Sequence, residues 1–65
     1  MINYILYNDD GDTIEDIIFN SKELAIYFGS ICYDWQDLDE FGYRLMKEYN
    51  AVGFQWDYLG GEGEN

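Results

Sequence analysis

The chain has 65 residues, in which 14 aspartates and glutamates stand against three lysines and arginines and no histidine, giving a formal net charge of −11. A chain this short forms one domain, and its negative charge excludes direct binding to nucleic acid, since duplex DNA itself carries one negative charge per about 1.7 Å. The single cysteine, Cys32, excludes an internal disulfide framework.

Aromatic side chains make up 20% of the chain. This content predicts a folded domain, because disordered acidic chains are poor in aromatic and β-branched residues. No stretch approaches the roughly 18 apolar residues of a membrane span. The segment MINYILYNDD lacks the positively charged start of a signal peptide, so we expect a cytoplasmic protein.

The first part of the chain is predicted to form a β-hairpin. Residues Ile2–Tyr7 (INYILY) and Thr13–Phe19 (TIEDIIF) are rich in β-branched and aromatic side chains. The intervening residues 8–12 (NDDGD) suit a turn, because Gly11 tolerates a positive φ and Asn and Asp side chains bond nearby backbone amides.

A short first helix is predicted over Ser21–Phe28. Asn20 or Ser21 is a suitable N-cap, and Glu23 is placed to complete a capping box. Gly29 is expected to end or bend the helix. Its apolar positions follow helical spacing and are Leu24, Tyr27, Phe28 and Ile31.

A longer second helix is predicted to follow. Either Asp34 or Asp37 can serve as its N-cap, and Asn50 is a suitable C-terminal stop. Helical spacing gives it one continuous apolar stripe, which predicts the face that packs on the core. The stripe consists of Leu38, Phe41, Leu45 and Tyr49.

The last part of the chain alternates between apolar and other residues, which predicts a strand with one buried face. Its apolar members are Val52, Phe54, Trp56 and Tyr58, and Trp56 is expected to lie in the core. Residues 60–65 (GGEGEN) are expected to form a flexible acidic tail after a single globular domain of residues 1–59. The fold class predicted is α+β, in the order ββααβ, with a three-stranded, mainly antiparallel sheet and helices on one face.

No well-defined catalytic or metal site is expected. Asp9, Asp10 and Asp12, with Glu15 nearby, suggest a calcium site. An EF-hand loop has its glycine at the sixth position, however, and with Gly11 there Leu6 would occupy the first ligand position, where a carboxylate is required. Histidine, the commonest general base, is absent, and Cys32 is expected to be a small core residue rather than a reactive thiol. We therefore expect no enzymatic activity, no cofactor and no metal.

The densest run of carboxylates lies in residues 34–40 (DWQDLDE), where the second helix begins. A negative first turn is also ordinary helix capping, favoured by about 0.3–1 kcal/mol. Trp35 is either an exposed anchor for a partner or a core residue at the helix start. The candidate partner-binding residues form a helix patch of Asp34, Trp35, Asp37, Asp39 and Glu40, and a hairpin patch of Asp9, Asp10, Asp12, Glu15 and Asp16.

In length, charge and aromatic content the whole chain resembles the small DNA-mimic inhibitors that bacteriophages and mobile elements carry against host defence enzymes, including anti-restriction and anti-CRISPR proteins. Residues 33–46 (YDWQDLDEFGYRLM) also resemble the acidic-aromatic segments of ArdA-type anti-restriction proteins. The chain departs from that pattern at Arg44, where a further acidic residue is expected, and it is far shorter than those proteins. The resemblance implies an acidic face that competes with DNA for a nuclease or restriction complex.

These observations lead to one hypothesis and one alternative. The hypothesis is an acidic DNA-mimic inhibitor in the host bacterial cytosol, which binds the basic nucleic-acid-binding surface of a CRISPR effector, a restriction enzyme or another DNA-processing protein. The alternative is a non-mimic inhibitor, antitoxin or adaptor that binds a basic partner through aromatic anchors. Either would act as a monomer or homodimer, without binding a membrane.

Overall fold

The structure is a computed structural model that describes residues 1–29, 32 and 34–59. The elements are strands β1 (Ile2–Tyr7) and β2 (Thr13–Phe19), helices α1 (Ser21–Phe28) and α2 (Trp35–Tyr49), and strand β3 (Gly53–Tyr58). The predicted α+β class and the order ββααβ are confirmed, and β1, β2 and α1 have the predicted bounds. Ile31 and the predicted tail at residues 60–65 lie outside the described residues.

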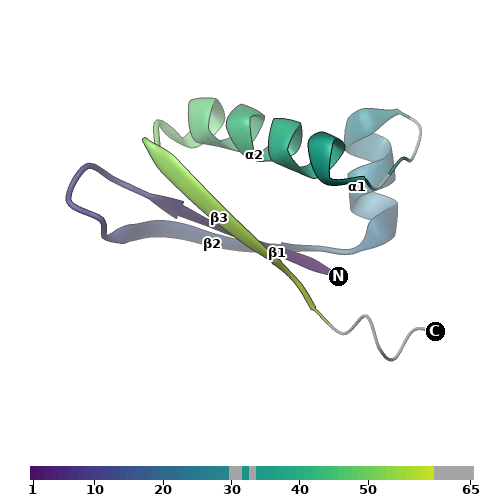
Figure 1. The fold of residues 1–65 in the computed structure, drawn as a ribbon, viewed down its shortest axis with the longest axis horizontal. Helices are drawn as coiled ribbons and strands as arrows, with labels where there is room; N and C mark the ends of the chain where they lie inside the picture. The colour runs from purple at the N-terminus through teal and green to yellow at the C-terminus, as the bar shows by residue number, and fades with distance from the viewer. Residues whose placement is uncertain (30–31, 33, 60–65) are drawn as a thin grey trace.

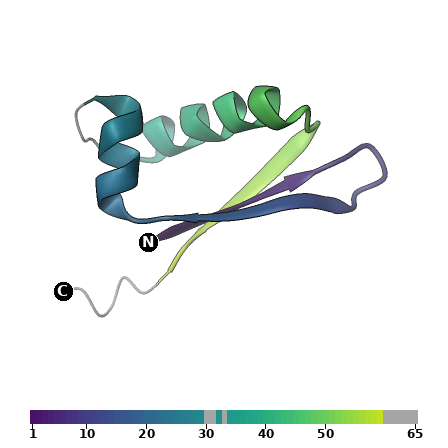
Figure 2. The ribbon, with the colours of Figure 1, turned by 180° about the vertical axis from the view of Figure 1, so that it is seen from behind.

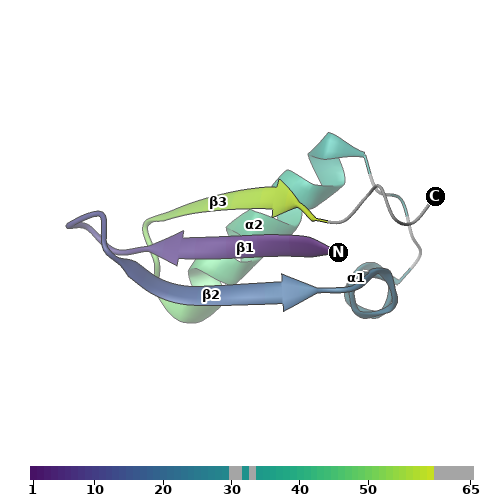
Figure 3. The ribbon, with the colours of Figure 1, turned by 90° about the horizontal axis from the view of Figure 1, so that it is seen from below.

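The three strands form one antiparallel sheet in the order β2-β1-β3, so the first strand of the chain is the central one (Figure 3). Tyr4 in β1 lies opposite Ile17 in β2 and Trp56 in β3. Because β1 has a neighbour on both sides and a helix above it, Tyr4 and Leu6 are fully buried and Ile2 is nearly so. The centre of the core is therefore built on β1.

A turn organised by Asn8 joins β1 and β2. The side-chain Oδ1 of Asn8 accepts hydrogen bonds from the backbone N–H groups of Asp10 at 3.0 Å and Asp12 at 2.9 Å. Gly11 adopts a φ of 85°, which accounts for a glycine at this position. The turn thus relies on the Asn8 side chain and leaves the carboxylates of Asp9, Asp10 and Asp12 exposed.

The ends of α1 are fixed by the predicted signals. Asn20 is the N-cap: its side chain accepts a hydrogen bond from the Glu23 N–H at 2.8 Å, and the Glu23 side chain accepts one from the Asn20 N–H at 3.0 Å. Gly29 ends the helix with a φ of 84°. Leu24 is the one fully buried residue of α1, and the helix stands at the end of the sheet (Figures 1 and 3).

Helix α2 lies over one face of the sheet and supplies most of the helical core (Figures 1 and 2). Its buried residues are Leu38, Phe41, Gly42 and Leu45. Tyr49, predicted to belong to this stripe, is exposed, because α2 crosses the strands obliquely and its last turn extends past the sheet (Figure 3). Asn50 ends the helix in the left-handed conformation with a φ of 58°, as predicted from its position.

Strand β3 is less buried than its alternating sequence predicts. Phe54 and Trp56 are half-buried against the core, whereas Tyr58 is 62% exposed and Val52 precedes the strand and is exposed. The physical reason is that β3 is an edge strand and α2 covers only part of it. The prediction that Trp56 is a core residue is therefore confirmed only in part, because Trp56 packs against the core but is half-buried.

Candidate functional site

One acid of the helix patch, Asp34, serves the structure of α2, and Asp37 lies beside it in the first turn. Asp34 is the N-cap, and its Oδ1 accepts a hydrogen bond from the backbone N–H of Asp37 at 3.0 Å. Both carboxyl groups also lie at the positive end of the helix dipole, which partly offsets their charge. Helix capping therefore accounts for the position of Asp34 without reference to a partner.

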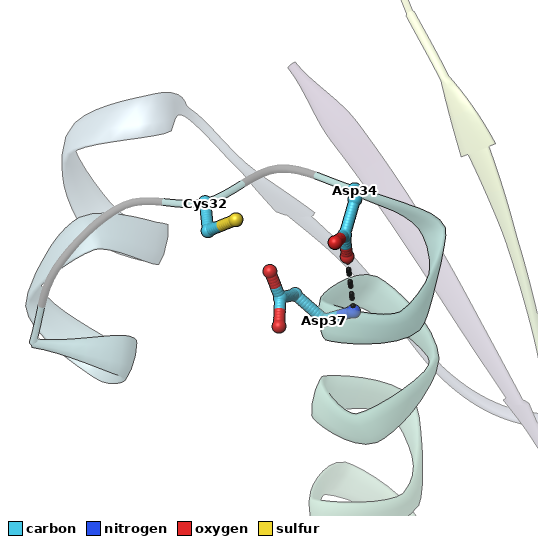
Figure 4. Close-up of side chains that lie close together, drawn as sticks. All are labelled: Cys32, Asp34 and Asp37. Atoms are coloured by element: carbon cyan, nitrogen blue, oxygen red, sulfur yellow. Dashed lines mark hydrogen bonds between the residues drawn. The ribbon is translucent and has the colours of Figure 1, made fainter.

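Cys32 is exposed, so the prediction that it is a core residue is wrong; it lies on the connection between α1 and α2, outside the packed layers. Its Sγ, one carboxylate oxygen of Asp34 and one of Asp37 lie within 4.8 Å of one another (Figure 4). A hydrogen bond to Asp37 and the negative charge of that residue raise the pKa of the Cys32 thiol. The thiol therefore stays protonated at neutral pH, whereas a nucleophile or a metal ligand requires the thiolate.

Asp39 connects α2 to β3. Its Oδ1 accepts a hydrogen bond from the indole Nε1 of Trp56 at 3.0 Å. The ring of Trp56 also lies 5.0 Å from that of Trp35, measured between centroids, at an interplanar angle of 36°. Trp35 is 73% exposed, which decides between the two alternatives for this residue: it lies on the surface and not in the core.

The two indoles border an open groove of about 230 Å³ between the start of α2 and the end of β3. Its lining residues are Trp35, Leu38, Trp56 and Tyr58, and it is termed the aromatic groove. Of these residues, the sequence marked only Trp35 as a candidate for binding. The spacing of Trp56 and Tyr58 on one strand face was a usable signal, but the position of β3 beside the start of α2 depends on the strand order.

The basic side chains do not neutralise the acidic ones. The Glu40 side chain is exposed on α2 and makes no hydrogen bond or ion pair with another described residue. More generally, no carboxylate pairs with a lysine or arginine within the part of the chain that the structure describes. Arg44 instead lies over the ring of Phe28, with its Cζ 6.0 Å from the ring centroid. The acidic surface is thus left uncompensated.

The geometry divides the hairpin patch. The turn at residues 9–12 lies at the end of the molecule opposite α1 (Figure 1). Glu15 and Asp16 follow as successive residues of β2, paired with Leu6 and Ile5 respectively, so their side chains point to opposite faces of the sheet. A flat partner surface that contacts the turn can therefore reach only one of these two acids.

An open hollow of about 430 Å³ lies beside the hairpin turn. Asp9 and Asp10 line it together with Asn50, the C-cap of α2. The negative end of the helix dipole therefore adds to the charge of these two acids, whereas at the other end of α2 the dipole opposes the charge. The negative charge at the hairpin end is therefore not offset by the helix dipole, whereas the charge at the start of α2 is partly offset.

No family model, curated protein or solved structure matches the chain. The longer of the two described helices, α2, has 15 residues, fewer than a membrane-spanning helix requires. Function is therefore inferred from two physical features of the described surface, the uncompensated carboxylates and the aromatic groove.

Proposed function

We propose that the protein is an acidic DNA-mimic inhibitor, which occupies the basic nucleic-acid-binding surface of a bacterial defence or DNA-processing protein in the cytosol. It acts by binding, and catalysis is no part of the proposal. The observation that carries the proposal is that the described carboxylates form no ion pair with lysine or arginine, in a chain of net charge −11.

Uncompensated charge has a physical cost that a basic partner removes. Like charges repel within a small domain and lower its stability, and they do so most at low salt, where the Debye length reaches about 30 Å at 0.01 M. A cationic surface relieves this repulsion on binding and also accelerates association through long-range attraction. The excess negative charge therefore lowers the stability of the fold but favours binding to a basic partner.

The distance between the two acidic patches fits a partner whose basic groove normally binds duplex DNA. The molecule is 37 Å long, with the hairpin turn at one end and the start of α2 toward the other (Figure 1). One helical turn of duplex DNA spans about 34–36 Å. A basic groove shaped for one turn of DNA is thus long enough to contact both the turn acids of the hairpin patch (Asp9, Asp10 and Asp12) and the helix patch.

A displacement experiment tests the mimicry. The immobilised protein is exposed to a nuclease-treated bacterial lysate and then washed, at constant salt, with duplex DNA, with RNA or with polyglutamate of equal charge. We expect nucleic acid to release the captured protein at a lower charge concentration than polyglutamate does, and mass spectrometry to identify it as a nucleic-acid-binding protein. A captured partner that stays bound in excess duplex and RNA contradicts the proposal.

Matched variants separate a specific acidic face from net charge alone. Glu40→Gln removes one exposed charge from the helix patch. Asp57→Asn removes one exposed charge from β3, on the sheet face that points away from α2. We expect the first variant to weaken binding to the captured partner and to reduce its salt dependence, while the second leaves both unchanged. Equal losses in the two variants would assign the binding to overall charge.

The aromatic groove favours a second candidate function, a non-mimic inhibitor, antitoxin or adaptor that binds a basic partner through aromatic anchors. Trp35 is exposed and surrounded by acidic residues, and tryptophan is enriched among interface residues that dominate binding energy. The same displacement experiment separates the two functions. Under this candidate, duplex DNA leaves the partner bound, whereas Trp35→Ala releases it.

A further inference from the structure

The aromatic groove exposes more aromatic surface than the fold requires. Trp35 is 73% exposed and Tyr58 is 62% exposed, while the core beneath them is already closed by Tyr4 and Leu38. Single exposed aromatic side chains are common on proteins, but a contiguous exposed group of them marks an interaction site. The groove is therefore a candidate binding site.

The rings of the groove are held in place before any occupant arrives. Trp56 is fixed by the hydrogen bond from its Nε1 to Asp39 and packs 6.3 Å from the ring of Tyr4 in the core. Trp35 in turn rests against Trp56, with 5.0 Å between the ring centroids. Because these side chains are ordered by contacts within the protein, binding at the groove loses little side-chain entropy.

The electrostatics of the groove select a cation. The faces of aromatic rings are negative, and Asp39 lies one helical turn after Trp35 on the same side of α2. Asp39 uses Oδ1 for Trp56, and its Oδ2 makes no hydrogen bond with another described residue. A stacked nucleobase does not fit this setting, because sites that stack bases are lined with cationic residues that contact the phosphates.

We infer that the aromatic groove receives an arginine side chain of the basic partner, stacked on the Trp35 ring and bonded at its edge to the Asp39 carboxylate. A guanidinium group suits the site better than an ammonium group, because it is planar, stacks on indole, is more weakly hydrated and presents several N–H donors at its edge. The inference depends on the proposed function only for the basic nature of the partner.

The test uses the whole protein labelled with ¹⁵N and three peptides with blocked ends: Gly-Arg-Gly, Gly-Lys-Gly and Gly-citrulline-Gly. Citrulline has nearly the shape of arginine without its charge. The two indole N–H signals, of Trp35 and Trp56, report on the groove directly. We expect the arginine peptide to shift both signals and to bind about two- to thirtyfold more tightly than either of the other two peptides.

Variants locate the binding. Trp35→Leu keeps an apolar side chain but removes the aromatic face, and Asp39→Asn keeps an acceptor for Trp56 but removes the charge. Both are expected to weaken binding of the arginine peptide. Tyr43→Phe alters an exposed aromatic residue of α2 that does not line the groove, and Asp57→Asn removes an exposed charge from β3 at a residue that does not line it either; both are expected to leave this binding unchanged.

Each other outcome overturns the inference. Equal binding of the arginine and lysine peptides shows that charge alone acts, and equal binding of the citrulline peptide shows that no cation is needed. Tighter binding of a Gly-Leu-Gly peptide assigns the groove to an apolar side chain. Because these titrations involve no nucleic acid, their failure leaves the displacement test of the proposed function unaffected, and the failure of that test leaves these results standing.

Discussion

The phenol of Tyr4, in the middle of the central strand, donates a hydrogen bond to the backbone carbonyl of Leu38 in α2. Tyr4 is fully buried and packs edge-on against Phe41, with ring centroids 5.0 Å apart. Because Leu38 also lines the aromatic groove, this bond ties the part of α2 that carries the groove to the sheet. The core and the candidate site are thus mechanically connected through one buried polar contact.

Tyr4→Phe is expected to lower the free energy of unfolding by about 0.5–1.5 kcal/mol, since it removes one buried hydrogen bond while keeping the ring. Urea denaturation monitored by tryptophan fluorescence measures the change. Tyr58→Phe is the matched control, because Tyr58 is exposed and makes no hydrogen bond through its hydroxyl with another described residue. A loss of stability no larger in Tyr4→Phe than in this control would contradict the role given to the bond.

Stability is expected to fall at alkaline pH through the same residue. Burial, and to a lesser extent the charge of Asp39, raises the pKa of Tyr4 well above the ordinary value of 10.0. The folded state then holds this proton more tightly than the unfolded state does, so the stabilisation is complete below pH 10 and is lost as the pH rises further. Urea midpoints measured from neutral to strongly alkaline pH test this, and Tyr4→Phe should show a shallower decline than the unaltered protein.

The local elements could be predicted from sequence because their signals are local. The capping box of Asn20 and Glu23 and the left-handed stop at Asn50 depend on residues within one turn, and both form as the sequence indicates. The contact between Trp35 and Trp56 could not be predicted, because it requires β3 to pair beside β1 near the start of α2. Helical spacing also does not indicate where a helix extends past its sheet. For this reason Tyr49, which spacing places on the packed stripe of α2, is exposed in the structure.

Gly42→Ala is expected to destabilise the protein by about 1–3 kcal/mol, as overpacking of a closed core does. A Cβ atom at this position would overlap the ring of Phe54. The better helix propensity of alanine, about 1 kcal/mol, acts in the opposite direction but is the smaller effect. Thermal or urea unfolding measures the difference, and Gly53→Ala, where a Cβ meets no atom within 4 Å, is the control. Equal stability of the two variants would show that Phe54 moves aside freely.

Cys32 is expected to react slowly with iodoacetamide despite its exposure. The hydrogen bond to Asp37 and the charge of that residue raise the pKa of the thiol, so less of the reactive thiolate is present at a given pH. Asp37→Asn should accelerate alkylation several-fold at mildly alkaline pH, whereas Glu40→Gln, which changes the net charge equally, should not. Mass spectrometry over time gives both rates. Equal rates in the two variants would remove the assigned effect of Asp37.

Neutralising the hairpin turn is expected to stabilise the protein while weakening its binding to the captured partner. The side chains of Asp9, Asp10 and Asp12 make no hydrogen bond within the described structure, because Asn8 organises the turn, so their replacement by asparagine removes charge and little else. Relief of repulsion should raise the free energy of unfolding at low salt, and added salt should shrink this gain; urea unfolding at low and at high salt measures both.

The contrast with Asp34→Ala makes this last prediction specific. That variant also removes negative charge, but it deletes the N-cap of α2 and is expected to cost about 0.5–2 kcal/mol. Opposite signs of the stability change at the two ends of the molecule would show that Asp34 serves the helix whereas the turn acids do not serve the fold, and weaker binding of the neutralised-turn variant to the captured partner would then assign those acids to binding. If the neutralised turn gains no stability at low salt, its carboxylates repel one another too weakly for a partner's cations to relieve anything on binding.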